Sequence, residues 1–235
     1  MPQFMVMILE NEVEERKLAP SETKALLEGQ SAWERELRAV SAYLDGERLR
    51  PASEGRRVSR RDGQLRVDRG PFGERALSAC YVVEAEGLDA AIKLAEKCPL
   101  APGAELEVRP LMKGALQPDR ANRRGRLFAF AVLGSAPSER SWIEVMDRID
   151  ESTRNHFAPD RFSGGVRLQE PARGRGMASA GGRRAVFDGP FLESKEVIGG
   201  LFFMRMADLQ EAVEWAGGSE FMKHGTLEIR ELWRS

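Results

Sequence analysis

Residues 69–74 read RGPFGE and residues 188–193 read DGPFLE, so the pattern Gly-Pro-Phe-x-Glu occurs twice at a separation of 119 residues. Other matches keep the same order in both halves: PSE at 20–22 and 137–139, GxRL at 46–49 and 165–168, and LEVR at 106–109 with LEIR at 227–230. Collinear matches over so long a period indicate a duplicated domain of about 110 residues. We therefore predict a first domain at 1–113, a polar, Arg-rich linker at 114–125 and a second domain at 126–235.

Each predicted domain starts with an apolar run, at 4–9 and at 127–133, which indicates a buried strand. A helix is expected after Pro20 with Ser21 as its N-cap, and an equivalent helix after Ser138. The dipeptides Asp62-Gly63 and Gly181-Gly182 suit two-residue hairpin turns, and each hairpin is expected within its own domain. The remaining strand, helix and strand are expected at 77–84, 88–97 and 105–111, and again at 200–206, 209–217 and 226–232.

This element order predicts an α+β fold: two ferredoxin-like domains, each with helices on one face of a mostly antiparallel sheet and with an inserted hairpin. The other face of such a sheet is a large apolar surface if nothing covers it. We expect the second domain to cover it, so that the two sheets pack face to face as an intramolecular pseudo-dimer.

Composition narrows the class of protein. Hydrophobic residues make up 42% of the chain and the formal net charge is -1, which predicts folded cores and argues against a protein that coats nucleic acid. The two cysteines, Cys80 and Cys98, are expected to be reduced and buried. No cofactor or metal is expected, because metal-ligand spacing and phosphate-binding glycine loops are both missing from the sequence. Neither a membrane span nor a signal peptide is evident, so a cytoplasmic location is expected.

The quoted residues resemble the YCII-related superfamily, and within it the DGPF-type proteins. The resemblance rests on the apolar first strand, the segment DGxxLxP at 45–51, the DGPF turn at 188–191 and the EVRP segment at 107–110. It implies a fold of the dimeric α/β-barrel type with a cleft between paired sheets. It implies no single activity: relatives of this fold class include isomerases, dehydrochlorinases and monooxygenases, and many DGPF-type proteins look like companions of alternative sigma factors.

The chain departs from the family pattern at two places. Arg69 stands in the first domain where the family carries the Asp of DGPF, which Asp188 keeps in the second. Some YCII proteins are proposed to use a His–Asp pair with the His early in the first helix, and neither half of this chain has a His there. Both departures weaken the transfer of acid–base catalysis to this chain.

Candidate site residues therefore come from the second domain. Asp188 is a candidate general base or ligand anchor, or alternatively the residue that caps its turn. His156, near Asp160, is a candidate acid–base helper, or alternatively a cation at a helix C-terminus. Arg167 is a candidate anion clamp. The ligand-binding set is completed by the residues that follow the DGPF turn, Glu193 and Lys195.

Three hypotheses of function remain open. The first is a small-ligand-binding or non-catalytic module, and the second is a small-molecule enzyme of isomerase or lyase type with its site in the cleft of the second domain. The third is a regulator of transcription that acts through protein contacts, because residues 48–69 contain eight arginines. The expected partners are a small molecule or a protein, not nucleic acid or a membrane, and the expected state is a monomeric pseudo-dimer or a homodimer.

Overall fold

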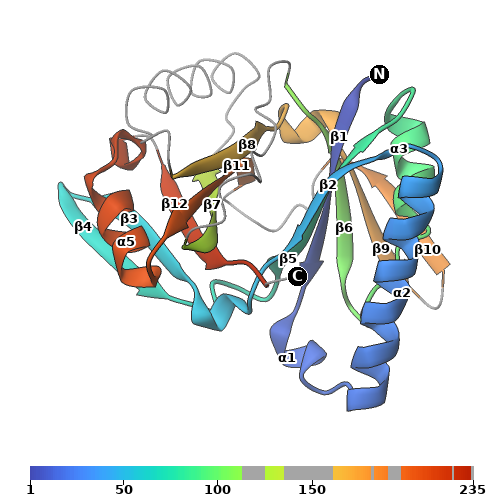
Figure 1. Cartoon of the computed structure of the whole chain (residues 1–235), viewed down its shortest axis with the longest axis horizontal. Helices are drawn as coiled ribbons and strands as arrows, with labels where there is room; N and C mark the ends of the chain where they lie inside the picture. The colour runs from blue at the N-terminus through green and yellow to red at the C-terminus, as the bar shows by residue number, and fades with distance from the viewer. Residues whose placement is uncertain (113–124, 135–160, 181–182, 190–196, 224, 234–235) are drawn as a thin grey trace. The chain divides into compact units, whose positions relative to one another are not determined.

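The computed structural model describes residues 1–112, 125–134, 161–180, 183–189, 197–223 and 225–233 of the chain (Figure 1). It is an α+β structure with two antiparallel sheets and few helices. The chain forms two compact units, each made of three segments. Unit 1 comprises Met1–Arg48, Gly73–Leu111 and Pro171–Leu192, and unit 2 comprises Leu49–Phe72, Met112–Glu170 and Glu193–Ser235.

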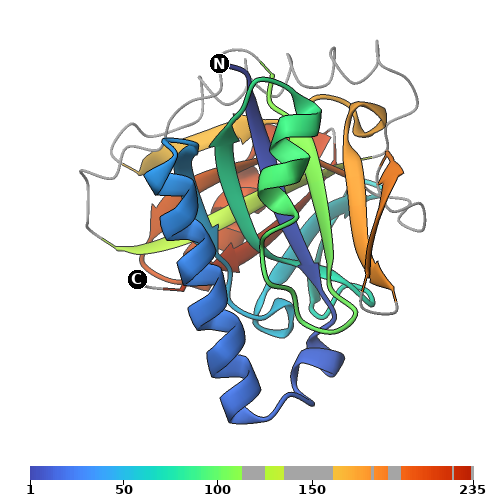
Figure 2. The same ribbon diagram turned by 90° about the vertical axis from the view of Figure 1, so that its right-hand side faces the viewer.

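Unit 1 contains a six-stranded sheet in the order β10-β9-β6-β1-β5-β2. Helices α2 (Pro20–Ala39) and α3 (Leu88–Ala95) lie on the same face of this sheet, as Figure 2 shows. The core between helices and sheet includes the side chains of Phe4, Val6, Ile8, Trp33 and Leu37. The strands are β1 (Gln3–Glu10), β2 (Tyr43–Arg48), β5 (Ala76–Glu84), β6 (Glu105–Pro110), β9 (Arg175–Ala180) and β10 (Arg183–Asp188). The helices are α1 (Glu12–Glu15), α2 (Pro20–Ala39) and α3 (Leu88–Ala95), with a 3₁₀ turn at Pro171–Arg173.

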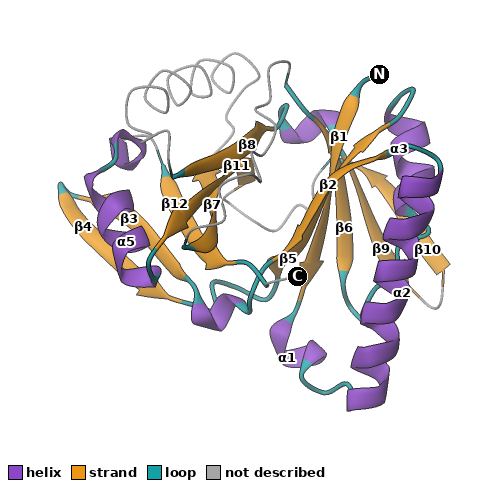
Figure 3. Cartoon of the chain, in the orientation of Figure 1, coloured by secondary structure: helices purple, strands orange, loops and turns teal. Residues whose placement is uncertain are grey.

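Unit 2 contains a second six-stranded sheet, in the order β4-β3-β12-β7-β11-β8 (Figure 3). Its core is aromatic: the rings of Phe130 and Phe202 stack with centroids 4.9 Å apart, and Trp215 of helix α5 meets Phe130 edge-on at 5.3 Å. The strands are β3 (Arg56–Arg61), β4 (Gln64–Arg69), β7 (Arg126–Gly134), β8 (Phe162–Arg167), β11 (Val197–Met206) and β12 (Thr226–Glu231). Helix α5 spans Leu209–Gly218, and 3₁₀ turns lie at Ala52–Glu54 and Glu220–Lys223.

The same four-strand arrangement occurs in both sheets. In unit 1 it is β6-β1-β5-β2 and in unit 2 it is β12-β7-β11-β8. Numbered within each half of the chain without its hairpin, both read 4-1-3-2, which is the strand order of a ferredoxin-like sheet. The second strand of each half in chain order, β2 or β8, was not predicted. The sequences YLDGER and FSGGVR are polar or glycine-rich and show no apolar alternation.

The two hairpins are exchanged between the halves of the chain. The β3–β4 hairpin pairs with β12, where Val58 lies opposite Leu227, and the β9–β10 hairpin pairs with β6, where Met177 lies opposite Leu106. The expectation that each hairpin stays with its own half is therefore wrong. The two hairpins have equivalent sequence patterns, and so do the strands they pair with, β6 and β12. The pattern alone therefore cannot decide which hairpin pairs with which strand.

The start of helix α2 differs from the expected position. Helix α2 begins two residues earlier than expected, with Ala19 rather than Ser21 as its N-cap, and the Glu22 carboxylate accepts a hydrogen bond from the Ala19 N–H at 2.7 Å. The predicted linker, apart from Gly125, and the predicted helix after Ser138 lie outside the described residues. No helix within the described ranges is long and apolar enough to cross a membrane.

Candidate functional site

Strand β1 ends in a buried carboxylate. Glu10 follows Phe4, Val6 and Ile8 at every second position, so its side chain lies on the helix-covered face of the sheet. It is only 2% exposed, and neither of its carboxylate oxygens accepts a hydrogen bond from any residue that the structure describes. A buried carboxylate without a partner destabilises the folded state strongly, so such a group marks a candidate ligand site.

A second acid lies beside Glu10 because the chain turns sharply after β1. The Asn11 side-chain oxygen accepts hydrogen bonds from the N–H groups of Val13 at 2.9 Å and Glu14 at 3.3 Å, which starts helix α1 at once. This turn brings Glu15 back towards Glu10. Burial raises the pKa of the Glu15 carboxyl, and the negative charge of Glu10 raises it further, whereas the Arg48 guanidinium lowers it.

One guanidinium of the same sheet face lies near Glu15. Arg48 ends β2 and lies opposite Ala79, which also pairs with Ile8, so all three side chains share the helix-covered face. The Arg48 guanidinium donates a hydrogen bond to the side-chain oxygen of Gln30. The Gln30 amide in turn donates to the Pro99 carbonyl at 3.0 Å, which orients it. We call Glu10, Glu15, Gln30 and Arg48 the Glu10 cluster.

Cys98 lies close to this cluster and is chemically inert at neutral pH. Burial raises the pKa of its thiol to about 12, against the lowering effect of Arg184 and Arg48. Cys80 has a pKa raised to about 12 as well, chiefly by burial. Both cysteines are free and buried, as the sequence predicted. A thiol with so high a pKa is not a nucleophile. Within the described part of the chain, no group of three or more His, Cys, Asp or Glu side chains could hold a metal ion.

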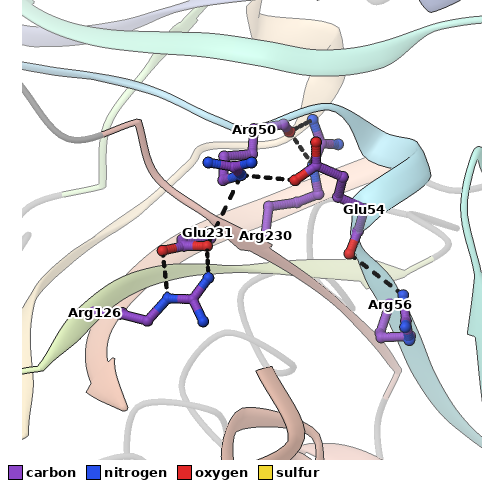
Figure 4. Close-up of polar contacts among 6 residues, drawn as sticks. All are labelled: Arg50, Glu54, Arg56, Arg126, Arg230 and Glu231. Carbon is purple, nitrogen blue, oxygen red and sulfur yellow. Dashed lines mark hydrogen bonds and ion pairs between the residues drawn. The ribbon is translucent and has the colours of Figure 1, made fainter. Parts of the chain in front are cut away.

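Unit 2 contains a different polar cluster, drawn in Figure 4. Its six residues come from both halves of the chain: Arg50, Glu54, Arg56, Arg126, Arg230 and Glu231. Arg126 donates through Nε to Glu231 at 2.6 Å, and Arg50 donates through Nε to Glu54 at 2.7 Å. Arg50 also lies 3.9 Å from the Glu231 carboxylate. These pairs join the segment before β3 to the strands β7 and β12.

At the centre of this cluster lies Arg230, whose side chain is 3% exposed. It donates through Nε to the Arg50 carbonyl at 2.7 Å and through Nη1 to the Glu228 carboxylate at 3.0 Å. Unit 1 has the equivalent pair, because buried Arg109 donates through Nε to Glu107 at 2.7 Å. A Glu-x-Arg pair therefore lies on each of the two strands that meet an exchanged hairpin, β6 and β12, and in unit 2 Arg230 holds the segment before β3 through the Arg50 carbonyl.

Of the predicted site residues, the structure describes Asp188 and Arg167, which lie in different units. Asp188, in unit 1, is 87% exposed and forms an ion pair with Arg175, its partner across the hairpin, at 2.5 Å. Arg167 is the last residue of β8, in unit 2. The other predicted residues, His156, Glu193 and Lys195, lie outside the described ranges. At the start of the DGPF turn, the Gly189 N–H donates a hydrogen bond to the carbonyl of Gly174, the residue before β9, at 3.0 Å.

Sequence reasoning missed Glu10. A signal was present, because residues 4–10 read FMVMILE and the alternate positions Phe4, Val6, Ile8 and Glu10 share one face of a strand. The apolar run at 4–9 predicts a strand buried on both faces, and Glu10 lies directly after that run, so the pattern did not single out the acid.

Comparison with known proteins supports a family for part of the chain. Residues 163–235 match the family model of the YCII-related domain. The curated protein sequences provide no match. Among solved structures, a protein provisionally named as a chlorite dismutase is similar at 9% identity and a TM-score of 0.44, covering 99% of this chain and 94% of that one. A provisionally named monooxygenase from Fusobacterium nucleatum subsp. nucleatum is similar at 12% identity and a TM-score of 0.43, covering 98% and 91%.

Proposed function

We propose that this protein is a small-ligand-binding module that takes a cationic amine at the Glu10 cluster of unit 1. One observation carries the proposal: the Glu10 carboxylate is buried and neither oxygen has a hydrogen-bond partner among the described residues. Burying such a group is costly for the empty protein, and a ligand that donates hydrogen bonds to it removes the cost.

The charges of the cluster favour a cation over a neutral ligand. The cluster holds two acidic side chains, Glu10 and Glu15, and a single guanidinium, that of Arg48, which already donates to Gln30. An ammonium group supplies one positive charge and three N–H donors. It therefore provides both the charge that balances the acids and the hydrogen bonds that the Glu10 oxygens lack. A ligand without N–H donors, such as a quaternary ammonium ion, supplies the charge alone.

We also propose that the whole chain is a DGPF-type member of the YCII-related superfamily that arose by tandem duplication. The match of residues 163–235 to the YCII-related domain and the 4-1-3-2 strand order of both sheets support this proposal. The face-to-face packing of the two sheets in the dimeric α/β-barrel manner remains part of the proposal.

The test is a thermal-shift and calorimetric titration of the full chain with ethanolamine and putrescine, with tetramethylammonium as the control cation. We expect the two primary amines to raise the melting temperature of the wild type, and tetramethylammonium to leave it unchanged. In Glu10→Gln the effect of the amines should be lost, while Glu36→Gln, an exposed acid on α2, should respond as the wild type does. Equal responses of wild type and Glu10→Gln, or no response to either amine, would contradict the proposal.

A further inference from the structure

Strand β4 is an edge strand of the unit 2 sheet. Among the described strands it pairs with β3 alone. Figure 1 shows it as the outermost strand of that sheet. All six of its residues are exposed, including Leu65 at 45% and Val67 at 44%. An edge strand with exposed apolar side chains is a template for another strand, unless the protein protects it.

The hairpin register shows which backbone groups of β4 remain available. Arg61 lies opposite Gln64 across the two-residue turn, and the pair that flanks such a turn is hydrogen-bonded. Hydrogen-bonded and non-hydrogen-bonded pairs then alternate along an antiparallel ladder. The N–H and C=O groups of Leu65, Val67 and Arg69 therefore point away from β3.

We propose that β4 pairs antiparallel with β4 of a second copy of this chain, about a two-fold axis that passes through Val67. In this register Val67 lies opposite the partner's Val67, and Leu65 lies opposite the partner's Arg69. The outward groups on both strands then form about six backbone hydrogen bonds. The exposed Leu65 and Val67 side chains of both copies form one continuous strip on the same face of the joined sheet.

The charges on β4 select this register. Arg66 lies opposite the partner's Asp68, and the two-fold axis repeats the pair, so two ion pairs form at non-hydrogen-bonded positions where side chains approach most closely. Neither residue forms an ion pair with any residue that the structure describes. An axis through Arg66 places it opposite the partner's Arg66, and an axis through Asp68 places two carboxylates opposite each other. Both alternatives are disfavoured by like-charge repulsion.

The equivalent edge of unit 1 lacks this self-complementarity, which argues for a specific contact rather than a general property of edge strands. In β10 the positions equivalent to Arg66 and Asp68 are Ala185 and Phe187. The single acid of β10, Asp188, already forms an ion pair with Arg175.

The test is sedimentation velocity of the full chain over a range of concentrations and salt. We expect a concentration-dependent dimer that weakens as salt rises. Arg66→Asp and Asp68→Arg should each weaken dimerisation about tenfold or more, because each change replaces two attractive pairs with two repulsive ones. The double variant Arg66→Asp/Asp68→Arg should restore the dimer, since it exchanges the charges without changing their pattern.

A backbone variant tests the strand pairing independently of charge. Val67→Pro removes an outward N–H that makes no bond to β3, so it should abolish the dimer and leave the hairpin folded. Circular dichroism of each variant establishes that it folds, and because Arg66 and Asp68 are exposed, the charge variants test the proposal even if Val67→Pro does not fold. A wild type that stays monomeric at its highest soluble concentration would overturn the proposal. So would single charge variants that dimerise as the wild type does, or a double variant that stays monomeric.

Discussion

Arg184, on strand β10 of the second half of the chain, donates a hydrogen bond to the carbonyl oxygen of Ala95, the last residue of helix α3 in the first half, at 3.3 Å. Its guanidinium also donates to the carbonyls of Glu96 and Cys98. The last carbonyls of a helix have no partner within the helix and carry partial negative charge. The exchanged hairpin therefore supplies the C-terminal cap of a helix that belongs to the other half.

Removal of this cap should destabilise the protein. We expect Arg184→Ala to lower the free energy of unfolding by about 1–2 kcal/mol, because three carbonyls lose a charged donor. Arg184→Lys should fall between, since it keeps the charge but loses the forked geometry. Urea unfolding measures the effect, with Arg35→Ala on the exposed side of α2 as the control. Identical midpoints for Arg184→Ala and Arg35→Ala would show that the contact does not stabilise the fold.

Glu10 should lower the stability of the folded protein and at the same time be required for amine binding. We expect Glu10→Leu to raise the free energy of unfolding by about 1–3 kcal/mol, because it removes a buried carboxylate whose oxygens have no partner. The same variant should lose the response to primary amines. Thermal unfolding with and without ethanolamine measures both effects. A Glu10→Leu variant less stable than the wild type would mean that the carboxylate has a structural partner in solution.

Glu15 should make stability depend on pH. Its pKa is raised in the folded state, by burial first, so the folded protein favours the protonated form. This contribution is fully present below the ordinary Glu pKa of about 4.3 and is lost as pH rises through the raised value. Glu15→Gln should therefore gain stability relative to the wild type as pH rises from about 4 to about 8. Urea midpoints across this range test it, and a constant difference between the two proteins would contradict the expectation.

The exchange point in unit 2 should tolerate no side chain at Gly55. A Cβ there would lie 2.5 Å from the Arg230 Cδ and 2.9 Å from the Ile229 carbonyl oxygen. We expect Gly55→Ala to cost about 1–3 kcal/mol, because buried Arg230 must move from its hydrogen bonds. Gly218→Ala is the matched control, since a Cβ there meets no atom within 4 Å. Equal unfolding free energies for the two variants would show that Arg230 relocates freely.

Asp188 separates the enzyme hypothesis from the structural one. Its carboxylate is 87% exposed, so loss of its ion pair with Arg175 should change the free energy of unfolding by less than about 0.5 kcal/mol. We expect Asp188→Asn to keep both stability and amine binding. Loss of a ligand response with stability unchanged would favour Asp188 as a functional residue.

Local features of the fold were predictable, whereas long-range partners were not. The apolar run at 4–9 and the Asp62-Gly63 turn have physical signatures within a few residues, and the structure has β1 and the β3–β4 hairpin there, with positive φ at both turn residues. Exchange of the hairpins has no local signature, because either hairpin satisfies either edge strand. Glu10 was missed for a related reason: alternation along β1 places it on the helix-covered face, but its burial also depends on elements outside residues 4–10.

The exchanged hairpins also affect how the chain is made. The β3–β4 hairpin is synthesised long before β12, the strand with which β3 pairs. The nascent chain therefore carries an Arg-rich hairpin without a sheet to join until β12 has been synthesised, and unit 2 cannot finish folding before that point. If the two halves were expressed separately, each fragment would contain the hairpin that the sheet of the other fragment lacks. The two fragments would therefore have to fold together.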